Sequence, residues 1–282
     1  MAKPLKILSC GAGIQSSTLL LMSIKGALPR VDCAIFADPQ WEGAATYEHL
    51  AWLTAESEAA GIPLYRVTAG DIKRHLETGF AAGQHRFASL PLHILNVDGS
   101  RSMVPRQCTR EFKIQPINAF IRTELLGLKP RARWPTEPVV DQWFGISSDE
   151  AQRMRDPAPN EQWKRHVYPL CGVPELMLGR TFSRSACVAW LAENYPGRRS
   201  MPASSCVGCP FHSQARWREM KATAPGDWAE AVEMDAKIRK GHEMNGEAFL
   251  HRSCVPLADA VLTDDAQLDL GFGEECMGYC GN

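Results

Sequence analysis

The sequence predicts an α/β fold in which an open, mostly parallel sheet is flanked by helices and followed by a cysteine-rich helical part. Short apolar runs alternate with helix-length segments through the first third of the chain. The first run ends in a glycine-rich turn, Cys10-Gly11-Ala12-Gly13. Beyond Asp156, prolines and cysteines become frequent. Strands separated by helices favour right-handed crossovers and parallel pairing, so the first part should form the sheet.

The predicted sheet is supplied by the first half of the chain. We expect its strands at Leu5–Leu8, Cys33–Ala37, Ile62–Val67 and Val139–Ile146. The helices that accompany them are expected at Ser16–Lys25, Tyr47–Ala60, Asp71–Glu77 and Glu111–Leu126. The stretch Phe80–Arg106 contains turn-forming residues and little periodicity, so we expect a long loop there.

The second half of the chain changes in character at the proline-rich transition Asp156–Pro159. We therefore expect an α/β domain over residues 1–156 and a cysteine-rich helical region packed on it over residues 157–282, with a flexible tail at 271–282. Val167–Leu170 could still add to the sheet. The expected helices of this region are Ser183–Asn194, Gln214–Ala222 and Asp227–Lys240.

The composition is that of a globular protein without a general affinity for nucleic acid. Hydrophobic residues make up 45% of the 282 residues, charged residues 22%, and the net charge is −1. A net charge this small provides no global positive field. No segment is long and apolar enough to be a signal peptide or to span a membrane. We expect a cytoplasmic protein with no membrane partner; a homodimer is compatible with the sequence.

The turn from Ser9 to Ser17 suits an anionic ligand. It follows a predicted strand of a parallel sheet, at the edge where such sheets bind ligands. Its glycines allow backbone N–H groups to approach a phosphate, and the helix that follows favours negative charge at its N-terminus. An ordinary glycine-rich turn with a capping serine is the alternative, because neither the Walker pattern nor G-x-G-x-x-G is present.

The ten cysteines favour a metal or redox role, because cytosolic proteins rarely form structural disulfides. Cys206-Val207-Gly208-Cys209-Pro210 is a C-x-x-C hairpin of the kind that presents two thiolates to one metal. Cys108 and Cys187 are the best candidates for the remaining ligands. Residue types and spacing leave both zinc and a four-iron cluster open. Three cations near Cys108, at Arg106, Arg110 and Lys113, indicate a site for an anion.

Five motifs, in order along nearly the whole chain, resemble the phosphoadenosine-phosphosulfate reductase family. They are Ser9 to Ser17 with Gly13-Ile14-Gln15; Asp38-Pro39-Gln40-Trp41-Glu42; Cys108-Thr109-Arg110-Glu111-Phe112-Lys113; Gly145-Ile146-Ser147-Ser148-Asp149-Glu150; and Glu275-Cys276-Met277-Gly278. Pro39 and Gln40 stand where the family has threonine and glycine, and Thr109 replaces the second cysteine of a pair found in its cluster-containing members.

The resemblance implies an adenine nucleotide alpha-hydrolase-like fold with a pyrophosphate-binding loop. The nucleotide-binding residues that it implies are Ser9, Gly11, Gly13, Gln15, Ser16, Ser17, Asp38, Arg110, Lys113, Gly145 and Ser147. It also favours a 4Fe-4S cluster over zinc, held by Cys108, Cys206 and Cys209. Cys187 is the candidate for the fourth ligand; otherwise the fourth ligand comes from elsewhere or one iron is left open. In the tail, it implies Cys276 as a nucleophile, and Cys280 would be its resolving partner.

Two functions and a simpler alternative remain open at this point. As a reductase, the protein would convert adenylyl sulfate or phosphoadenylyl sulfate to sulfite and an adenosine phosphate, with thioredoxin or glutaredoxin as electron donor. As an ATP-dependent sulfurtransferase, it would adenylate tRNA or DNA, release pyrophosphate and deliver sulfur from a donor through a cluster or a persulfide. The simpler alternative is a zinc-stabilised nucleotide-binding module without catalysis.

Overall fold

The larger of two sheets contains five parallel strands. In a computed structural model, residues 3–81, 90–172, 181–198, 201–202, 204–239 and 246–262 are described. The order of the strands is β3-β2-β1-β6-β7. Their bounds are Leu5–Ser9 (β1), Cys33–Ala37 (β2), Leu64–Val67 (β3), Val140–Phe144 (β6) and Lys164–Val167 (β7). The α/β fold with a parallel sheet that the sequence predicts is confirmed.

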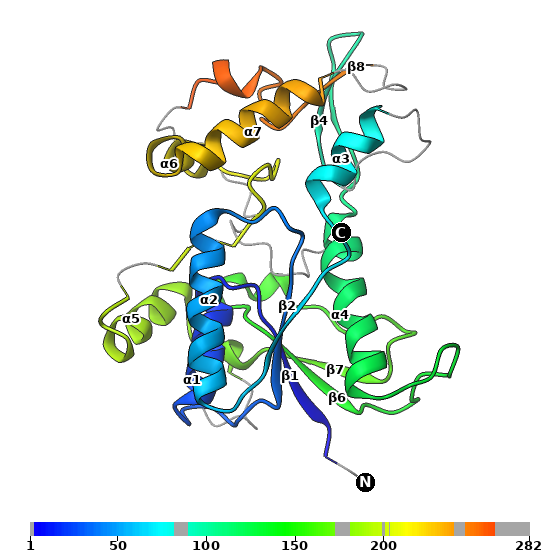
Figure 1. Ribbon diagram of the computed structural model, residues 1–282, viewed down its shortest axis with the longest axis vertical. Coiled ribbons are helices and arrows are strands. Elements are labelled where there is room, and N and C mark those ends of the chain that lie inside the picture. Colours follow the sequence, from blue (N-terminus) through cyan, green and yellow to red (C-terminus); the bar gives the residue numbers. More distant parts are fainter. Residues whose placement is uncertain are drawn as a thin grey trace.

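Helices cover both faces of this sheet (Figure 1). On one face lie α1 (Ile14–Ile24), α2 (Ala44–Ala59) and α5 (Arg184–Asn194), with α1 in contact with both of the others. On the other face a continuous helical segment consists of a π-helical turn at Thr109–Ile114, α4 (Gln115–Phe120) and a second π-helical turn at Ile121–Leu125. Apolar side chains of the sheet are buried on each side, which explains why β2 is buried at every position.

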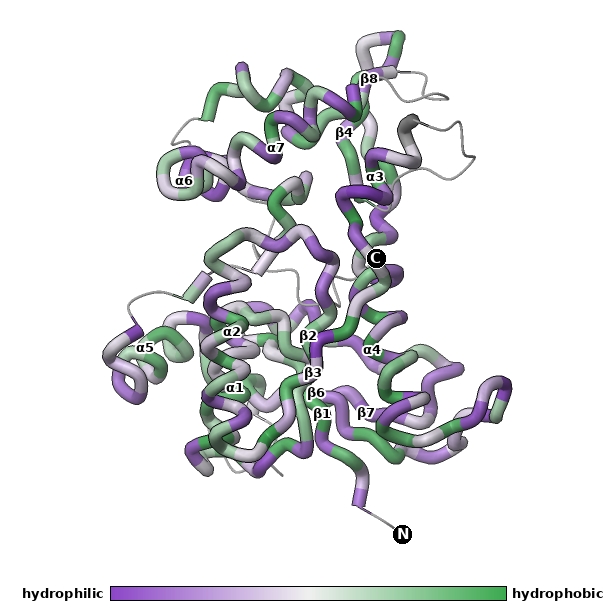
Figure 2. Tube along the Cα trace, in the orientation of Figure 1, coloured by the Kyte–Doolittle hydropathy of each residue, from purple (hydrophilic) through white to green (hydrophobic). Residues whose placement is uncertain are grey.

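A second, smaller sheet lies beyond the carboxyl ends of the parallel strands (Figure 1). It is antiparallel, in the order β5-β4-β8, with bounds Arg101–Met103 (β5), His93–Asn96 (β4) and Gly246–Phe249 (β8). Helices α3 (Ile72–Ala81), α6 (Gln214–Thr223) and α7 (Pro225–Lys237) share an apolar cluster with it. Hydrophobic and hydrophilic residues interleave along these helices, as expected where each buries one face (Figure 2).

The hairpin β4–β5 corrects the expectation of a long loop over Phe80–Arg106. Its turn is closed by Asp98, whose Oδ1 accepts hydrogen bonds from the Ser100 backbone N–H at 2.9 Å and from the Ser100 hydroxyl. Gly99 follows with φ of +80°, a conformation that glycine adopts at little cost. Strand β4 then pairs with β8, far away in the sequence. Neither β4 nor β5 exceeds four residues, so neither strand produces a periodic pattern in the sequence.

Short 3-10 segments complete the described structure at Ser148–Arg153, Pro169–Cys171 and Leu257–Asp259. The chain crosses between the two sheets more than once. Strand β7 lies beyond residue 156 but joins the parallel sheet, whereas β4 and β5 precede residue 156 but pair with β8. The division into domains 1–156 and 157–282 stays a prediction. Within the described ranges, no helix combines the length and the apolar character that crossing a membrane requires.

Candidate nucleotide site and cysteine cavity

The loop between β1 and α1 is closed by its own hydrogen bonds. The Ser16 hydroxyl accepts a bond from the Gly11 backbone N–H at 3.2 Å and donates to the Gly13 carbonyl at 3.3 Å. Ala12 has φ of +57°, so the chain turns sharply before the helix. Helix α1 begins after Gly13, which makes no side-chain cap bond. Its first backbone N–H groups therefore remain the natural donors for an anion.

Gln15 connects this loop to the end of β6. Its Nε2 atom donates to the Ser147 hydroxyl at 3.3 Å and to Glu150 Oε2 at 2.9 Å. Gln15, Ser16 and Ser147 are completely buried, as is Gly145 in the turn that precedes Ser147. Two motifs that the sequence separates by about half the chain are thus joined at the carboxyl edge of the sheet.

Two further serines of the loop have partners within the protein. The Ser9 hydroxyl accepts from Gln142 Nε2 at 2.8 Å. The Ser17 hydroxyl lies 2.8 Å from Nε2 of His49, a residue of α2. Burial, and then the charge of Arg198, lower the pKa of His49 to about 4, so its ring is neutral at pH 7. These hydroxyls hold the loop in place, and the backbone is left to bind a ligand.

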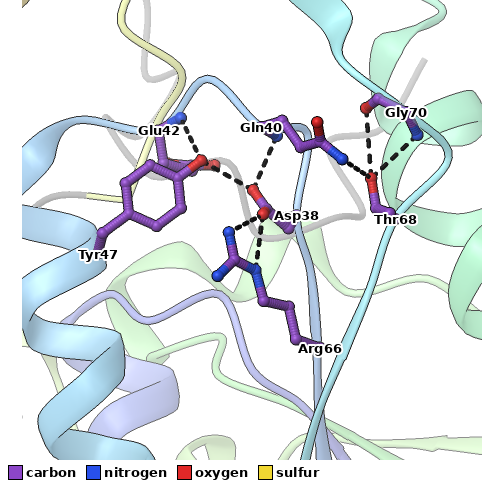
Figure 3. Close-up of polar contacts among 7 residues, drawn as sticks. All are labelled: Asp38, Gln40, Glu42, Tyr47, Arg66, Thr68 and Gly70. Atoms are coloured by element: carbon purple, nitrogen blue, oxygen red, sulfur yellow. Dashed lines mark hydrogen bonds and ion pairs between the residues drawn. The ribbon is translucent and has the colours of Figure 1, made fainter.

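Asp38, at the end of β2, organises the segment that follows it (Figure 3). Its Oδ1 atom accepts bonds from the Gln40 backbone N–H at 2.8 Å and from the Tyr47 hydroxyl at 2.9 Å. Its Oδ2 atom accepts from Nε of Arg66 at 2.7 Å, and a second guanidinium nitrogen of Arg66 completes the ion pair. Both carboxylate oxygens are therefore engaged within the protein. A nucleotide contact at Asp38 would have to use the backbone.

Cys108, Cys206 and Cys209 line one cavity, together with Arg106 and Lys113. Cys108 immediately precedes the first π-helical turn, and the other two belong to the C-x-x-C hairpin. The volume of the cavity is about 20 Å³, enough for one water molecule. Three of the four cysteines that we expected as metal ligands thus line one cavity, and their role as ligands stays a prediction.

The hairpin 206–209 is held by the segment after β2. Cys206 forms an antiparallel bridge with Glu42, and the Val207 backbone N–H donates to the Trp41 carbonyl at 2.8 Å. The Cys209 N–H donates to the Cys206 carbonyl at 3.1 Å and so closes a tight turn. His212 directs its Nε2 at the Cys206 carbonyl, 3.0 Å away, so this ring nitrogen bonds to backbone.

Buried charge lies beside the cysteines. Lys113 Nζ is 3.2 Å from Glu42 Oε1, and both side chains are almost completely buried. The Arg106 guanidinium lies 5.2 Å from the centre of the Phe211 ring. These cations could offset the negative charge of thiolates or of a cluster. Arg110, in contrast, is exposed and does not line the cysteine cavity.

Cys187 is not brought together with the other three expected ligands. It is completely buried in the apolar cluster formed by α1, α5 and the sheet, and it does not line the cysteine cavity. Its helix, α5, packs against α1. Cys276 and Cys280 lie outside the described residues.

The thiol donors suit a thiophilic metal, but they do not form a closed site. Within the described parts of the chain, no group of three or more His, Cys, Asp or Glu side chains is arranged so that it could hold a metal ion. Structural zinc sites use four ligands, whereas three cysteines could hold a four-iron cluster with one iron open. A cluster in a cavity of about 20 Å³ would require the lining side chains to move apart. The donor chemistry therefore fits a cluster better than structural zinc. The cavity, however, is too small for a cluster.

A larger cavity, of about 660 Å³, lies beside the β1–α1 loop. Its lining includes His49, which bonds to Ser17, and Arg184, whose NH1 donates to Gln15 Oε1 at 3.4 Å. Arg198 and Arg216 also line it. Sequence reasoning selected none of these residues. They come from three separate helical regions, and no local pattern sets them apart from surface arginines.

In comparisons with protein-family models and with curated proteins, this chain matches neither a family nor a curated sequence. The resemblance to the sulfonucleotide reductases thus remains an expectation based on the sequence motifs.

Proposed function

We propose that the protein is an adenine-nucleotide-dependent enzyme of sulfur chemistry. The observation that carries this proposal is the convergence of Cys108, Cys206 and Cys209 on one cavity, although Cys108 is distant from the hairpin in sequence. The cavity is connected to the carboxyl edge of the parallel sheet through Glu42 and Trp41. Nucleotide binding and thiol chemistry can therefore share the same edge of the fold.

The β1–α1 loop is the proposed site for the nucleotide's phosphates. The first N–H groups of α1 would donate to phosphate oxygens, and the helix dipole would favour their negative charge. Gln15 and Ser16 fix the loop through their hydrogen bonds to the end of β6 and to Gly11 and Gly13. The phosphates would thus meet donors that are already oriented, which lowers the entropy lost on binding.

In the cysteine cavity, Cys108, Cys206 and Cys209 would hold the proposed four-iron cluster only after the lining side chains move apart, because among the described residues they are not arranged as a metal site. When bound, the cluster would supply an open iron for a sulfur atom. Lys113 and Arg106 would lower the cost of placing negative charge there, and Trp41 would exclude water from one side of the hairpin, since Trp41 is buried against it. Three cysteines in the cavity, with Cys187 elsewhere, favour the sulfurtransferase reaction on tRNA or DNA.

Reduction of a sulfonucleotide is the second candidate, favoured by the sequence Glu275-Cys276. In that reaction the Cys276 thiolate would attack the sulfur of the sulfonucleotide, expel the adenosine phosphate and form a cysteine thiosulfonate. A dithiol protein such as thioredoxin or glutaredoxin would then attack the cysteine sulfur, release sulfite and become a disulfide after its second thiol regenerates Cys276.

The two reactions are separated by their products. Sulfite released from adenylyl sulfate or phosphoadenylyl sulfate with thioredoxin, and lost in Cys276→Ser, would support reduction. Pyrophosphate released from ATP only when tRNA or DNA is present would support sulfur transfer. If anaerobically prepared protein yields neither product and binds no adenine nucleotide, the proposal is wrong.

A further inference from the structure

The 660 Å³ cleft is built by four helices and by residues of the segment between α5 and α6. Its walls come from the first turns of α2, the beginning of α5, most of α6 and the beginning of α7, together with Arg198, Met201 and Pro202. Ligand pockets typically occupy roughly 300 to 1,000 Å³, so this cleft has room for a single small molecule of nucleotide size. A nucleic-acid duplex would not fit within it.

Three arginines line the cleft. Arg216 donates from NH1 to Glu219 Oε2 at 2.8 Å, but its Nε is buried without a hydrogen-bond partner. The Arg198 guanidinium lies 4.2 Å from the centre of the Trp52 ring. Its charge also lowers the pKa of His49, another residue of the lining, after the larger effect of burial. Arg184 completes the set at the start of α5.

His49, which lines the cleft, has one ring nitrogen without a hydrogen-bond partner. The residue is only 2% exposed. Its Nε2 lies 2.8 Å from the Ser17 hydroxyl, but Nδ1 is buried and has no hydrogen-bond partner. A buried polar atom without a partner destabilises the folded protein. A ligand that bonds to Nδ1 would remove this destabilisation.

Three carboxylates also line the cleft. Asp227, from α7, accepts a bond from the Ala44 backbone N–H at 3.2 Å and so stabilises the N-terminus of α2, where Gly43 makes no side-chain cap bond. Glu219 pairs with NH1 of Arg216, and Glu48 is exposed. The cleft therefore offers an anion the guanidinium of Arg198, which lies on the Trp52 ring, and the Nε of Arg216.

We propose that this cleft binds a phosphate-bearing, nucleotide-sized ligand, with Arg184, Arg198 and Arg216 contacting its phosphate oxygens and His49 bonding to one of its polar groups. Guanidinium groups suit phosphate because they donate in a planar, bidentate fashion. The inference deepens the proposed function and rests on it for the identity of the ligand. Two contacts, Ser17 with His49 and Gln15 with Arg184, connect the cleft to the β1–α1 loop.

The phosphate could belong to a free adenine nucleotide or to a single nucleotide of a polynucleotide acceptor. Titration calorimetry with ATP, and separately with a short single-stranded RNA, distinguishes these sources. We expect Arg198→Ala and Arg216→Ala each to weaken binding by about tenfold, because each loses a charge-assisted contact. Arg74→Ala removes an exposed arginine of α3 outside the cleft and should bind like the wild type.

Arginine-dependent binding of ATP alone supports the inference with the free nucleotide as ligand, and arginine-dependent binding of the RNA supports it with a polynucleotide. Wild-type affinity for both ligands in Arg198→Ala and Arg216→Ala overturns it. Ser16→Ala, which removes the two hydrogen bonds that close the β1–α1 loop, separates the two proposals. If only Ser16→Ala weakens binding, the proposed loop site stands and the cleft inference fails. If only the arginine variants do, the cleft stands and the loop site fails. If the wild type binds neither ligand, both are wrong.

Discussion

The indole ring of Trp41 lies against the backbone of Gly208, so a β-carbon at position 208 would come within 2.8 Å of three ring atoms. The Trp41 carbonyl also accepts the hydrogen bond of the Val207 N–H, and Glu42 bridges to Cys206. The segment after β2 therefore packs against the C-x-x-C hairpin and holds it in position. The position of two cysteines depends on residues at the carboxyl edge of the parallel sheet.

Gly208→Ala should destabilise the protein because its methyl group would overlap Trp41. Overpacking of this kind costs about 1 to 3 kcal/mol. Chemical unfolding followed by circular dichroism measures the loss, and Gly226→Ala serves as the control because nothing lies within 4 Å of a β-carbon there. Trp41→Phe provides a smaller ring, so adding it to Gly208→Ala should recover part of the loss. Equal stability of Gly208→Ala and the control would show that Trp41 does not constrain the hairpin.

Tyr47→Phe tests the network around Asp38 (Figure 3). The hydroxyl donates to Asp38 at 2.9 Å and accepts from the Glu42 N–H at 3.3 Å. Its removal should lower the free energy of unfolding by about 1 to 2 kcal/mol, because two polar groups lose a partner. Tyr65 packs on Phe120 at 4.8 Å between ring centroids, and Tyr65→Phe should change stability by less than about 0.5 kcal/mol. A matching loss in both variants would contradict a specific role for the Tyr47 hydroxyl.

Lys113→Met should be more harmful than the double variant Glu42→Gln with Lys113→Met. The single change leaves the Glu42 carboxylate buried without the ammonium group 3.2 Å away, at a cost of about 3 to 5 kcal/mol. Neutralising both partners removes the uncompensated charge, so part of the stability should return. Lys237→Met breaks an exposed ion pair and should have a much smaller effect. Additive losses at Glu42 and Lys113 would show that the two residues act independently.

Buried neutral histidines should make the protein less stable below pH 6.5. Burial lowers the pKa of His49 to about 4 and that of His212 to about 3, whereas the ordinary value is 6.5. Between these values the unfolded chain binds protons that the folded protein does not, so stability is fully present above pH 6.5 and falls as the pH decreases. Each group contributes at most about 1.4 kcal/mol per pH unit.

Urea unfolding between pH 7 and pH 4.5 measures this loss, and His49→Gln should reduce its slope. A wild-type slope in that variant would show that His49 binds its proton equally in both states.

Most elements of the parallel sheet could be predicted because their signals are local. Cys33–Ala37 is a continuous apolar run and forms β2 with those limits, and helix α5 begins one residue after its capping serine, Ser183. Strand β8 could not be predicted, because its four residues form a strand only through their pairing with β4, which is distant in the sequence. The place of Cys187 in the apolar cluster beside α1 could not be predicted for a related reason: distance along the chain says little about which face of α5 meets α1.

The candidate site could be predicted where a short motif determines its own conformation. The C-x-x-C hairpin and the Ser9–Ser17 loop are such motifs, because both are closed by bonds between neighbouring residues. His49 and the three arginines of the cleft are not, because helices distant in sequence bring them together. Asp38 was found by resemblance, but its side chain serves the fold.

The most direct test of the proposed cysteine site is the iron and acid-labile sulfide content of protein purified anaerobically. We expect both elements in the wild type, retained in Cys187→Ser and lost in Cys108→Ser, Cys206→Ser and Cys209→Ser. A wild type that contains zinc and no iron, or a loss of iron in Cys187→Ser while Cys108→Ser retains it, would contradict the account.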